Sequence, residues 1–252
     1  MNHRHSESIL RLENVSLQAT VGSDFLLQNI SGDFKRGEIV GIVGASGSGK
    51  TSLLRLLNRL VSPHEGRIVI ANSLGKNLTA TQWRQSIVLA PQEPKLLGMK
   101  VINALKYPLK LQRLAESEIR QRVDTWIDLL RIQEQWLNKT ELQLSLGQRQ
   151  LVAIARALIM QPQVLLLDEP TSALDVGMAT YVLKVLKEIN QSQHLTIVMV
   201  SHQLELLEGF CDRLLFLERG RLIKDFSTSD VCYSTIQARL EQSHLEQKEE
   251  WD

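Results

Sequence analysis

The chain has 252 residues, of which 43% are hydrophobic and 23% are charged, as in an ordinary globular protein of one or two domains. Its 29 Lys and Arg against 28 Asp and Glu give a net charge of +1, which offers no broad electrostatic surface for nucleic acid or anionic lipid. The longest apolar runs, such as residues 195–200, have the length of a strand and not the roughly 20 residues of a membrane span. We therefore expect no nucleic-acid binding and no direct membrane insertion.

The N-terminus and the cysteines indicate the compartment. The first residues, 1–7, carry no apolar signal segment. The two cysteines, Cys211 and Cys232, have neither the spacing of a zinc site nor that of a disulfide framework. Both observations predict a protein of the reducing cytoplasm.

The N-terminal part of the chain predicts two kinds of strand. Residues 9–39 read as short strands joined by polar turns, which indicates a small antiparallel sub-sheet. Residues 38–43 form a short apolar, β-branched run that is typical of a parallel strand buried on both faces. A glycine-rich turn follows, and then four leucines recur at the spacing of a helix face: Leu53, Leu56, Leu57 and Leu60. Pro63 is expected to end this helix.

Four further apolar runs follow, with helical patterns between most of them. The runs are at residues 87–90, 164–167, 195–200 and 214–217. The apolar faces of two intervening helices consist of Leu151, Ile154, Ala155 and Leu158, before Pro162, and of Val182, Val185, Leu186 and Ile189. Strands that alternate with helices predict an α/β fold with a mostly parallel sheet.

Two stretches depart from this alternation. Residues 92–144 contain no convincing strand, and we interpret them as an inserted helical subdomain; one helix face there consists of Ile119, Val123, Ile127 and Leu130. Residues 227–252 are polar and predict a short helix with an acidic tail. We expect one domain over 1–252, whose core is formed by 9–91 and 145–226.

The glycine-rich turn fits the P-loop pattern of Gly, four residues, then Gly-Lys-Thr. It consists of Gly44, Ala45, Ser46, Gly47, Ser48, Gly49, Lys50 and Thr51. Glycines let backbone N–H groups converge on phosphate oxygens, the helix N-terminus adds its dipole and Lys50 adds a full charge. Thr51 offers a hydroxyl to Mg²⁺. The alternative is a plain glycine turn, but the strand before it and the helix after it favour the phosphate site.

Two carboxylates follow the apolar run at 164–167. Asp168 stands where a parallel strand presents a carboxylate to Mg²⁺ at its carboxyl end. Glu169 is the candidate to polarise an attacking water, because successive residues of an extended chain point in different directions. The alternative is an exposed acidic pair that opens a turn before Pro170. The P-loop earlier in the chain favours the metal and water roles.

Together with four further motifs in a fixed order, these sites make residues 9–222 resemble the nucleotide-binding subunit of an ATP-binding cassette (ABC) transporter. The four motifs are the Q-loop with Gln92, the signature motif with Ser145, Gly147 and Gln148, the D-loop with Asp175, and the switch histidine, His202. Each has a structural alternative: a loop glutamine, a capping box that opens a helix at Ser145, and a structural histidine. The capping box and an anion site are compatible, since a helix N-terminus itself attracts anions.

The resemblance implies a P-loop NTPase core and two cofactors, ATP and Mg²⁺. Thr51, Asp168 and Gln92 are then the residues near the metal. Hydrolysis is implied for Glu169 and His202, together with Gln92. The fold is accordingly expected to combine the mostly parallel sheet, the N-terminal antiparallel sub-sheet and the inserted helical subdomain.

The resemblance also implies partners. Ser145, Gly147, Gln148 and Asp175 are expected to close on the nucleotide of a second cassette, so that ATP joins two copies as a homodimer. Hydrolysis then powers transport of a solute through separate transmembrane permease subunits, which places the chain on the cytoplasmic face of a membrane, as in the bacterial inner membrane. The alternatives are a non-transport cassette that acts on DNA or ribosomes, and a regulatory cassette with weak hydrolysis. The solute and the direction of transport stay open.

Three features qualify the resemblance. The family has glycine where this chain has Leu146, a side chain that is expected to point inward from the first helical turn. The segment 16–21 lacks the usual adenine-stacking aromatic, so that Leu17 or Val21 would supply only apolar contact, with Phe25 the nearest ring. An apolar cluster after Gln92 is expected either to receive a permease helix or to pack in the core: Leu96, Leu97, Met99 and Val101.

Overall fold

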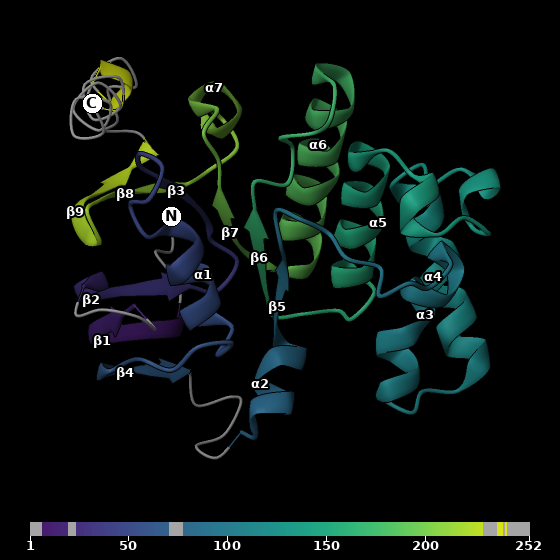
Figure 1. Cartoon of the computed structure of the whole chain (residues 1–252), viewed down its shortest axis with the longest axis horizontal. Coiled ribbons are helices and arrows are strands. Elements are labelled where there is room, and N and C mark those ends of the chain that lie inside the picture. The colour runs from purple at the N-terminus through teal and green to yellow at the C-terminus, as the bar shows by residue number, and fades with distance from the viewer. Residues whose placement is uncertain (1–6, 20–23, 71–77, 229–235, 239, 241–252) are drawn as a thin grey trace, which may run out of the picture.

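The computed structural model describes residues 7–19, 24–70, 78–228, 236–238 and 240. An antiparallel sheet lies at one end, helices α3 and α4 lie at the other, and a larger sheet with its covering helices lies between them (Figure 1). Residues 236–238 of the predicted C-terminal segment are helical, whereas Cys232 and most of the predicted acidic tail lie outside the described residues.

The antiparallel sheet has three strands in the order β2-β1-β4. They are β1 (Ser8–Gln18), β2 (Phe25–Lys35) and β4 (Glu65–Ile70). The predicted sub-sheet is confirmed, but its first two strands are long, with 11 residues each, where short strands were expected. The sequence did not indicate β4, because that edge strand exposes most of its side chains and shows no apolar run.

The larger sheet has six strands in the order β5-β6-β7-β3-β8-β9. They are β3 (Ile39–Val43), β5 (Ile87–Ala90), β6 (Val164–Asp168), β7 (Thr196–Val200), β8 (Arg213–Glu218) and β9 (Arg221–Ser227). The pairs from β5 to β8 are parallel, and β9 pairs antiparallel with β8. The expected mostly parallel sheet is therefore confirmed, and β9 is an addition at its edge.

The helices are α1 (Lys50–Leu57), α2 (Ala80–Ser86), α3 (Val101–Leu111), α4 (Glu116–Leu129), α5 (Leu146–Leu158), α6 (Val176–Gln193) and α7 (Leu204–Leu207). Short 3-10 turns at Glu134–Trp136 and Glu141–Gln143 complete the stretch between α4 and α5. Among the described residues, no helix combines the length and the apolar character needed to cross a bilayer.

Helix α1 ends earlier than Pro63 predicted. Arg59 adopts a left-handed backbone with φ of 55°, which stops the helix after Leu57. Leu60 consequently leaves the helix face, and 53% of it is exposed. Helix α2, which the sequence did not indicate, covers this end: the indole N–H of Trp83 donates to the Leu57 carbonyl at 2.8 Å, and Arg84 donates to the Arg59 carbonyl at 3.1 Å.

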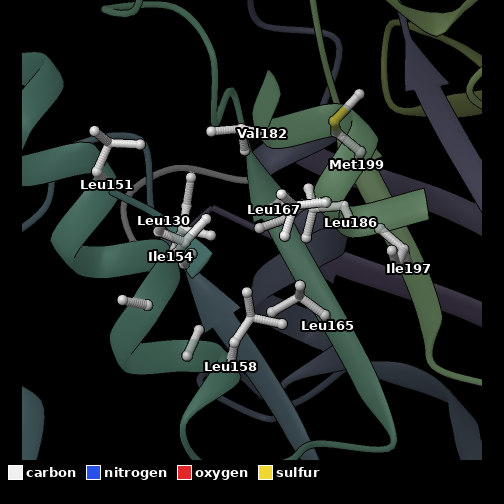
Figure 2. Packing of buried hydrophobic residues seen from close by; sticks show 14 of the residues in the cluster. Leu130, Leu151, Ile154, Leu158, Leu165, Leu167, Val182, Leu186, Ile197 and Met199 are labelled. Atoms are coloured by element: carbon white, nitrogen blue, oxygen red, sulfur yellow. The ribbon is translucent and has the colours of Figure 1, made fainter. Parts of the chain in front are cut away.

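The parallel sheet separates two hydrophobic cores. One core lies between the two sheets and encloses α1, with Val164 and Leu166 of β6 facing it. The other lies on the opposite face, where Leu165 and Leu167 pack beside Ile154 of α5 (Figure 2). Alternate residues of β6 thus face opposite cores, as the pleat of a strand requires. The second core continues without interruption into α3 and α4.

Helix α4 of the predicted helical segment is anchored to α6. The hydroxyl of Tyr181 in α6 donates to the Leu129 carbonyl at 3.0 Å, and the Arg131 guanidinium lies 3.8 Å from the centre of the Tyr181 ring. The predicted helix face is present, with Ile119 and Val123 buried in α4. The helical insertion and the sheet-covering helices are therefore joined by polar contacts as well as by a shared core.

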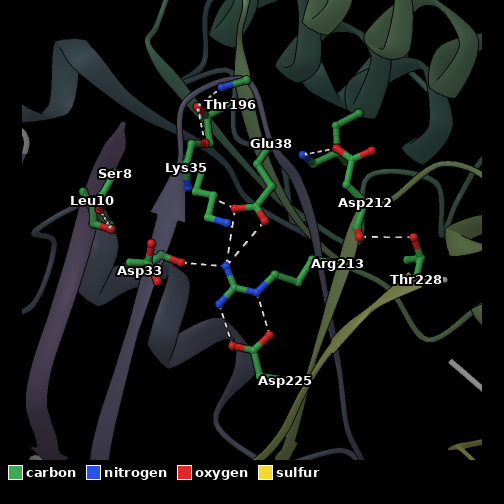
Figure 3. Close-up of polar contacts among 12 residues, drawn as sticks. Ser8, Leu10, Asp33, Lys35, Glu38, Thr196, Asp212, Arg213, Asp225 and Thr228 are labelled. Carbon is green, nitrogen blue, oxygen red and sulfur yellow. Dashed lines mark hydrogen bonds and ion pairs between the residues drawn. The ribbon is translucent and has the colours of Figure 1, made fainter. Parts of the chain in front are cut away.

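Arg213 at the start of β8 connects the two sheets (Figure 3). Its guanidinium donates twice to the Asp225 carboxylate of β9, both at 2.5 Å, and once to the Asp33 carbonyl of β2, at 2.8 Å. The Glu38 carboxylate lies 3.4 Å away. The hydrogen bonds to Asp225 are the main cause that raises the pKa of Arg213, and burial opposes the rise. This half-buried cation therefore connects strands from both sheets.

Replacing Arg213 tests this connection. Arg213→Met leaves two carboxylates without their charged donor, so we expect the free energy of unfolding to fall by about 1.5–3 kcal/mol in urea denaturation. Arg67→Met is the matched control, because the Arg67 side chain is 74% exposed in its ion pair with Glu13 and should contribute less than ~1 kcal/mol. Equal losses in the two variants would contradict the connecting role.

Candidate functional site

Most of the predicted site residues follow four neighbouring parallel strands. The P-loop follows β3, His202 follows β7, Asp168 ends β6 with Glu169 next to it, and Gln92 follows β5. These strands are adjacent in the order β5-β6-β7-β3. The carboxyl ends of parallel strands lie on the same edge of a sheet, where α/β proteins bind their ligands. The topology therefore gathers residues that are up to 158 positions apart in the chain between Gly44 and His202.

The P-loop is a tight turn in which glycine is required at its end. Gly49 is the N-cap of α1 and has a φ of 100°, which L side chains rarely adopt. A Cβ atom at Gly49 would also lie 2.7 Å from the Leu26 carbonyl oxygen. The turn therefore brings the N-terminus of α1, with its unpaired N–H groups, to the sheet edge.

Two side chains of the loop fit an anion. The ammonium of Lys50 donates to the carbonyls of Gly44 and Ala45 at 2.8 and 2.7 Å, so it lies across the mouth of the turn. Burial lowers the pKa of Lys50, and the carboxylates of Glu169 and Asp168 oppose that shift. Within the described part of the chain, the buried hydroxyl of Ser48 has no hydrogen-bond partner. A phosphate would give both groups a charged acceptor.

A hydroxyl and a carboxylate lie together beside the loop. The Thr51 hydroxyl donates to the Asp168 carboxylate at 3.2 Å. Burial raises the pKa of Asp168, the hydrogen bond from Thr51 opposes the rise, and the nearby charge of Glu169 adds to it. Oxygen ligands of this kind suit Mg²⁺, which usually combines one or two protein oxygens with substrate phosphates. The pair therefore fits a magnesium ion that is shared with a bound phosphate group.

Glu169 and His202 form a pair at the ends of β6 and β7. The His202 Nε2 and the Glu169 carboxylate are 2.9 Å apart. Glu169 has a left-handed backbone with φ of 50°, and its N–H donates to the Val200 carbonyl of β7 at 3.1 Å. Asp168 continues β6 and Glu169 turns away from it. The two acids therefore lie at different positions of the same edge, separated by the left-handed turn at Glu169 and not, as the sequence predicted, by the alternation of an extended chain.

The predicted capping box at the start of α5 is confirmed. The Gln148 N–H donates to the Ser145 hydroxyl at 3.1 Å, and the Ser145 N–H donates to the Gln148 side-chain oxygen at 3.0 Å. The expectation that Leu146 points inward is wrong, since 45% of it is exposed. The first turn of α5 has no buried face to receive it, because its inner side is occupied by a close backbone contact at Gly147, where a Cβ atom would lie 2.5 Å from the Ala173 carbonyl.

Two other predicted residues lie at a helix end and in an exposed loop, and Leu17, a candidate base contact, does not. Asp175 is the N-cap of α6, and its carboxylate accepts the Met178 N–H at 2.9 Å. Gln92 is exposed beyond β5. Leu17 is buried in the core between the sheets and is therefore not free to contact a base, and Val21 lies outside the described residues.

The loop after Gln92 divides the predicted apolar cluster. Leu96 and Val101 are fully buried, so core packing is correct for these two. Leu97 is 64% exposed, on a turn where its φ is 57° and where Gly98 follows. Of this cluster, Leu97 is thus the side chain that is available to a partner.

Two charged side chains fix the backbone of this loop. The Leu96 N–H donates to the Glu141 carboxylate at 2.6 Å, and Arg156 of α5 donates to the Lys95 carbonyl at 2.9 Å. Burial lowers the pKa of Arg156, and the charge of Glu141 opposes that shift. Glu141 and Arg156 therefore fix the two residues before Leu97, and the Leu97 side chain is held in its exposed position.

Sequence reasoning missed one residue at this edge. Gln150 of α5 is 2% exposed, and its amide bonds to the Glu169 carbonyl at 2.7 Å and to the Ala173 N–H at 3.1 Å. The available signal was a glutamine one turn before Ile154 on the apolar face of a predicted helix. Because a buried amide needs hydrogen-bond partners, such a residue is expected to have a fixed position in the fold.

Comparison with known proteins identifies relatives. The family profile described as ABC transporter matches residues 27–172. A methionine import ATP-binding protein, MetN, of Francisella tularensis subsp. holarctica (strain OSU18) is 40% identical over 228 residues, which are 89% of this chain and 65% of that protein. A MetN 2 protein of Pectobacterium atrosepticum is 35% identical over 88% of this chain and 68% of its own length. The chain thus spans about two thirds of these relatives.

Solved structures agree with the fold. The dimeric structure of MJ0796, described as a bacterial ABC transporter cassette, has a TM-score of 0.79 at 29% identity and covers 87% of this chain and 99% of its own. CbiO1 of Clostridium perfringens, part of the ABC transporter complex cbiONQ, has a TM-score of 0.78 at 30% identity and covers 96% and 99%.

The buried Asp168 should reduce the stability of the ligand-free protein. Because the folded pKa of Asp168 is raised, its ionised form is disfavoured at neutral pH, so Asp168→Asn should raise Tm near pH 7.5 by about 2–4 °C. The gain should shrink as the pH falls through the raised folded pKa and disappear below about pH 3, where the carboxyl is protonated in both folded and unfolded chains. Asp124→Asn, at an exposed position of α4, is the control; a lower Tm for Asp168→Asn at pH 7.5 would contradict the prediction.

Proposed function

This chain belongs to the ABC transporter family, and from that premise we propose that it hydrolyses ATP to power transport of a solute through separate membrane-spanning subunits. The observation that carries the proposal is the position of Lys50, Asp168 and the Glu169–His202 pair on one sheet edge. The named relatives are import subunits, so a non-transport or regulatory role is not favoured.

Each side chain has a role that its position supports. The P-loop N–H groups and Lys50 bind the β- and γ-phosphates. Thr51 and Asp168 hold Mg²⁺, which neutralises charge that develops on the phosphates. Glu169 accepts a proton from the attacking water, and His202, at 2.9 Å from it, orients that carboxylate and contacts the γ-phosphate. Gln92, which is exposed beyond the end of β5, would add an oxygen ligand to this ion.

A second copy completes the site in this proposal. Ser145, Gly147 and Gln148 lie at the N-terminus of α5, where a helix attracts anions, and Asp175 lies at the N-terminus of α6. Within the described part of the chain, the Lys50 ammonium donates to the Gly44 and Ala45 carbonyls of its own loop and to neither of these helix ends. The dimeric cassette MJ0796 supports an arrangement in which two copies share nucleotides.

We propose that the segment 92–144, which includes the loop that precedes α3, contacts the permease. We interpret 92–144 as a subdomain that moves with Gln92 when the γ-phosphate leaves, while 9–91 and 145–226 form the nucleotide-binding core. The exposed Leu97 lies in that loop and is held outward by Glu141 and Arg156. We therefore propose that the chain acts on the cytoplasmic face of a membrane, where it binds permease subunits and does not enter the lipid.

The relatives' names suggest the cargo. MetN proteins are described as methionine import subunits, so we propose import of a small polar solute, with methionine the first to test. The relatives have additional length that this chain does not span. Leu146 alters the surface that would face the second nucleotide. Residues 16–19 contain no aromatic side chain to stack on the base, so the affinities for ATP and GTP should be compared directly.

Substitutions of Glu169 and Lys50 test hydrolysis and dimer formation. Glu169→Gln should lower the ATPase rate by at least about 10²-fold and leave a dimer with bound ATP, measured by phosphate release and light scattering. Lys50→Ala should abolish ATP binding and stay monomeric. Lys184→Ala, on an exposed part of α6, is the control and should keep the wild-type rate. A monomeric Glu169→Gln protein with ATP, alone and with its permease, would refute the shared site.

Leu97→Asp tests the permease contact. A charge at this exposed position should prevent binding to an apolar surface, so the variant should lose co-purification with a membrane permease by at least about 10-fold while its own Tm stays unchanged. Val69→Asp is the control, because Val69 is 40% exposed on the edge strand β4, at the other end of the molecule. Normal co-purification of Leu97→Asp would place the permease contact elsewhere.

A further inference from the structure

The buried amide of Gln150 joins α5 to the turn that carries Glu169. Its NH₂ group donates to the Glu169 carbonyl at 2.7 Å and to the Ser172 hydroxyl at 3.2 Å. Its oxygen accepts the Ala173 N–H at 3.1 Å. With 2% of Gln150 exposed, water does not replace these partners. One side chain therefore satisfies three groups of the 169–173 turn.

The same turn places Glu169 in a conformation that needs support. Its φ of 50° lies in the left-handed region, which a residue with a Cβ atom rarely occupies. The Glu169 carbonyl accepts three donors: Gln150, the Ser172 hydroxyl at 3.0 Å and the Ser172 N–H at 3.3 Å. This conformation directs the Glu169 carboxylate to His202, 2.9 Å away. The backbone that aims the carboxylate is thus fixed in part from α5.

A close backbone contact reinforces the joint. At Gly147, one turn before Gln150, a Cβ atom would lie 2.5 Å from the Ala173 carbonyl, so α5 approaches the turn as closely as its backbone allows. Gly147 lies in the first turn of α5, the helix that is proposed to meet a second nucleotide. Through this close contact, a displacement of the N-terminus of α5 would be transmitted to the turn at 169–173.

We propose that Gln150 is a positioning residue that sets the backbone of Glu169 and couples the N-terminus of α5 to the carboxylate that polarises water in the same chain. The inference rests on the proposed ATP hydrolysis for its kinetic consequence, but the contacts exist without nucleotide. A nucleotide that the partner copy presents to Ser145 and Gly147 thereby influences the carboxylate beside the chain's own nucleotide. Gln150 touches neither substrate nor metal in this proposal.

Two variants of Gln150 separate positioning from packing. Gln150→Met keeps the volume and loses every hydrogen bond, so kcat should fall by roughly 10-fold or more at all pH values, with KM for ATP within about twofold of wild type. Gln150→Glu keeps the acceptor for Ala173 but donates only when protonated. Burial raises the pKa of the introduced carboxyl. Its kcat relative to wild type should therefore be low near about pH 8.5 and recover towards about pH 6, because the acid form again donates to the Glu169 carbonyl.

Each rate is expressed as a ratio to wild type at the same pH. Asp168, Glu169 and His202 lie on the same edge in every variant, and Gln150→Met, which adds no charge, is the reference for their contribution. Gln121→Met, at an exposed position of α4, is the control and should leave kcat unchanged. Wild-type kcat in Gln150→Met, or a pH-independent ratio for Gln150→Glu, would overturn the proposal.

Hydrogen exchange keeps the test independent of hydrolysis. In Gln150→Glu the amide of Ser172, which donates to the Glu169 carbonyl, and its neighbours in 169–174 should exchange faster relative to wild type near about pH 8.5 than near about pH 6, after correction for intrinsic rates. If wild type does not hydrolyse ATP, the proposed function fails while this measurement still tests Gln150. If Gln150→Met does not fold, Ser172→Ala replaces it, since it removes one donor to the Glu169 carbonyl and should lower kcat in the same direction. Unchanged exchange in Gln150→Glu would overturn the inference.

Discussion

Burial of the parallel sheet on both faces is the constraint on which the rest of the structure depends. Each strand from β5 to β8 must present apolar side chains to two cores, as Leu165 and Leu166 of β6 do on opposite faces. Polar groups are therefore kept out of the middle of these strands and collect at and beyond their ends. The strand order brings four of those ends together, so a charged site arises at one edge of an otherwise apolar layer.

The same burial sets the electrostatics of the site. It lowers the pKa of Lys50 and raises the pKa of Asp168, so each group is drawn towards its neutral form; the Thr51 hydrogen bond to Asp168 and the opposite charges nearby oppose this. A site in this condition gains from the arrival of phosphate and a divalent cation, which restore favourable partners to both charges. The proposed affinity for these ions and the expected loss of stability without them would thus have one physical cause.

Local sequence was sufficient for the parts whose signal is continuous. The glycine-rich turn, the buried strands predicted at 38–43 and 164–167, and the capping box at Ser145 depend on neighbours in the chain. The capping box appears as predicted, and the strands lie within one residue of their predicted bounds. The edge strands β4 and β9 were not predictable from apolar runs because they expose most of their side chains. The outward position of Leu146 and the partners of Gln150 depend on contact with the turn at 169–174, which lies far away in sequence and is fixed only by the fold.

The contacts between α2 and the end of α1 give the phosphate loop a distant support. With eight residues, α1 is about 12 Å long, so its carboxyl end lies close to the loop at its start. There Trp83 and Arg84 donate to carbonyls that would otherwise carry the negative end of the helix dipole, and Arg59 lies 4.9 Å from the Trp83 ring. Anion attraction at one end is thus balanced by donors at the other. A change at Trp83 or Arg84 of α2 would therefore alter the electrostatic potential at the loop without changing any residue of the loop itself.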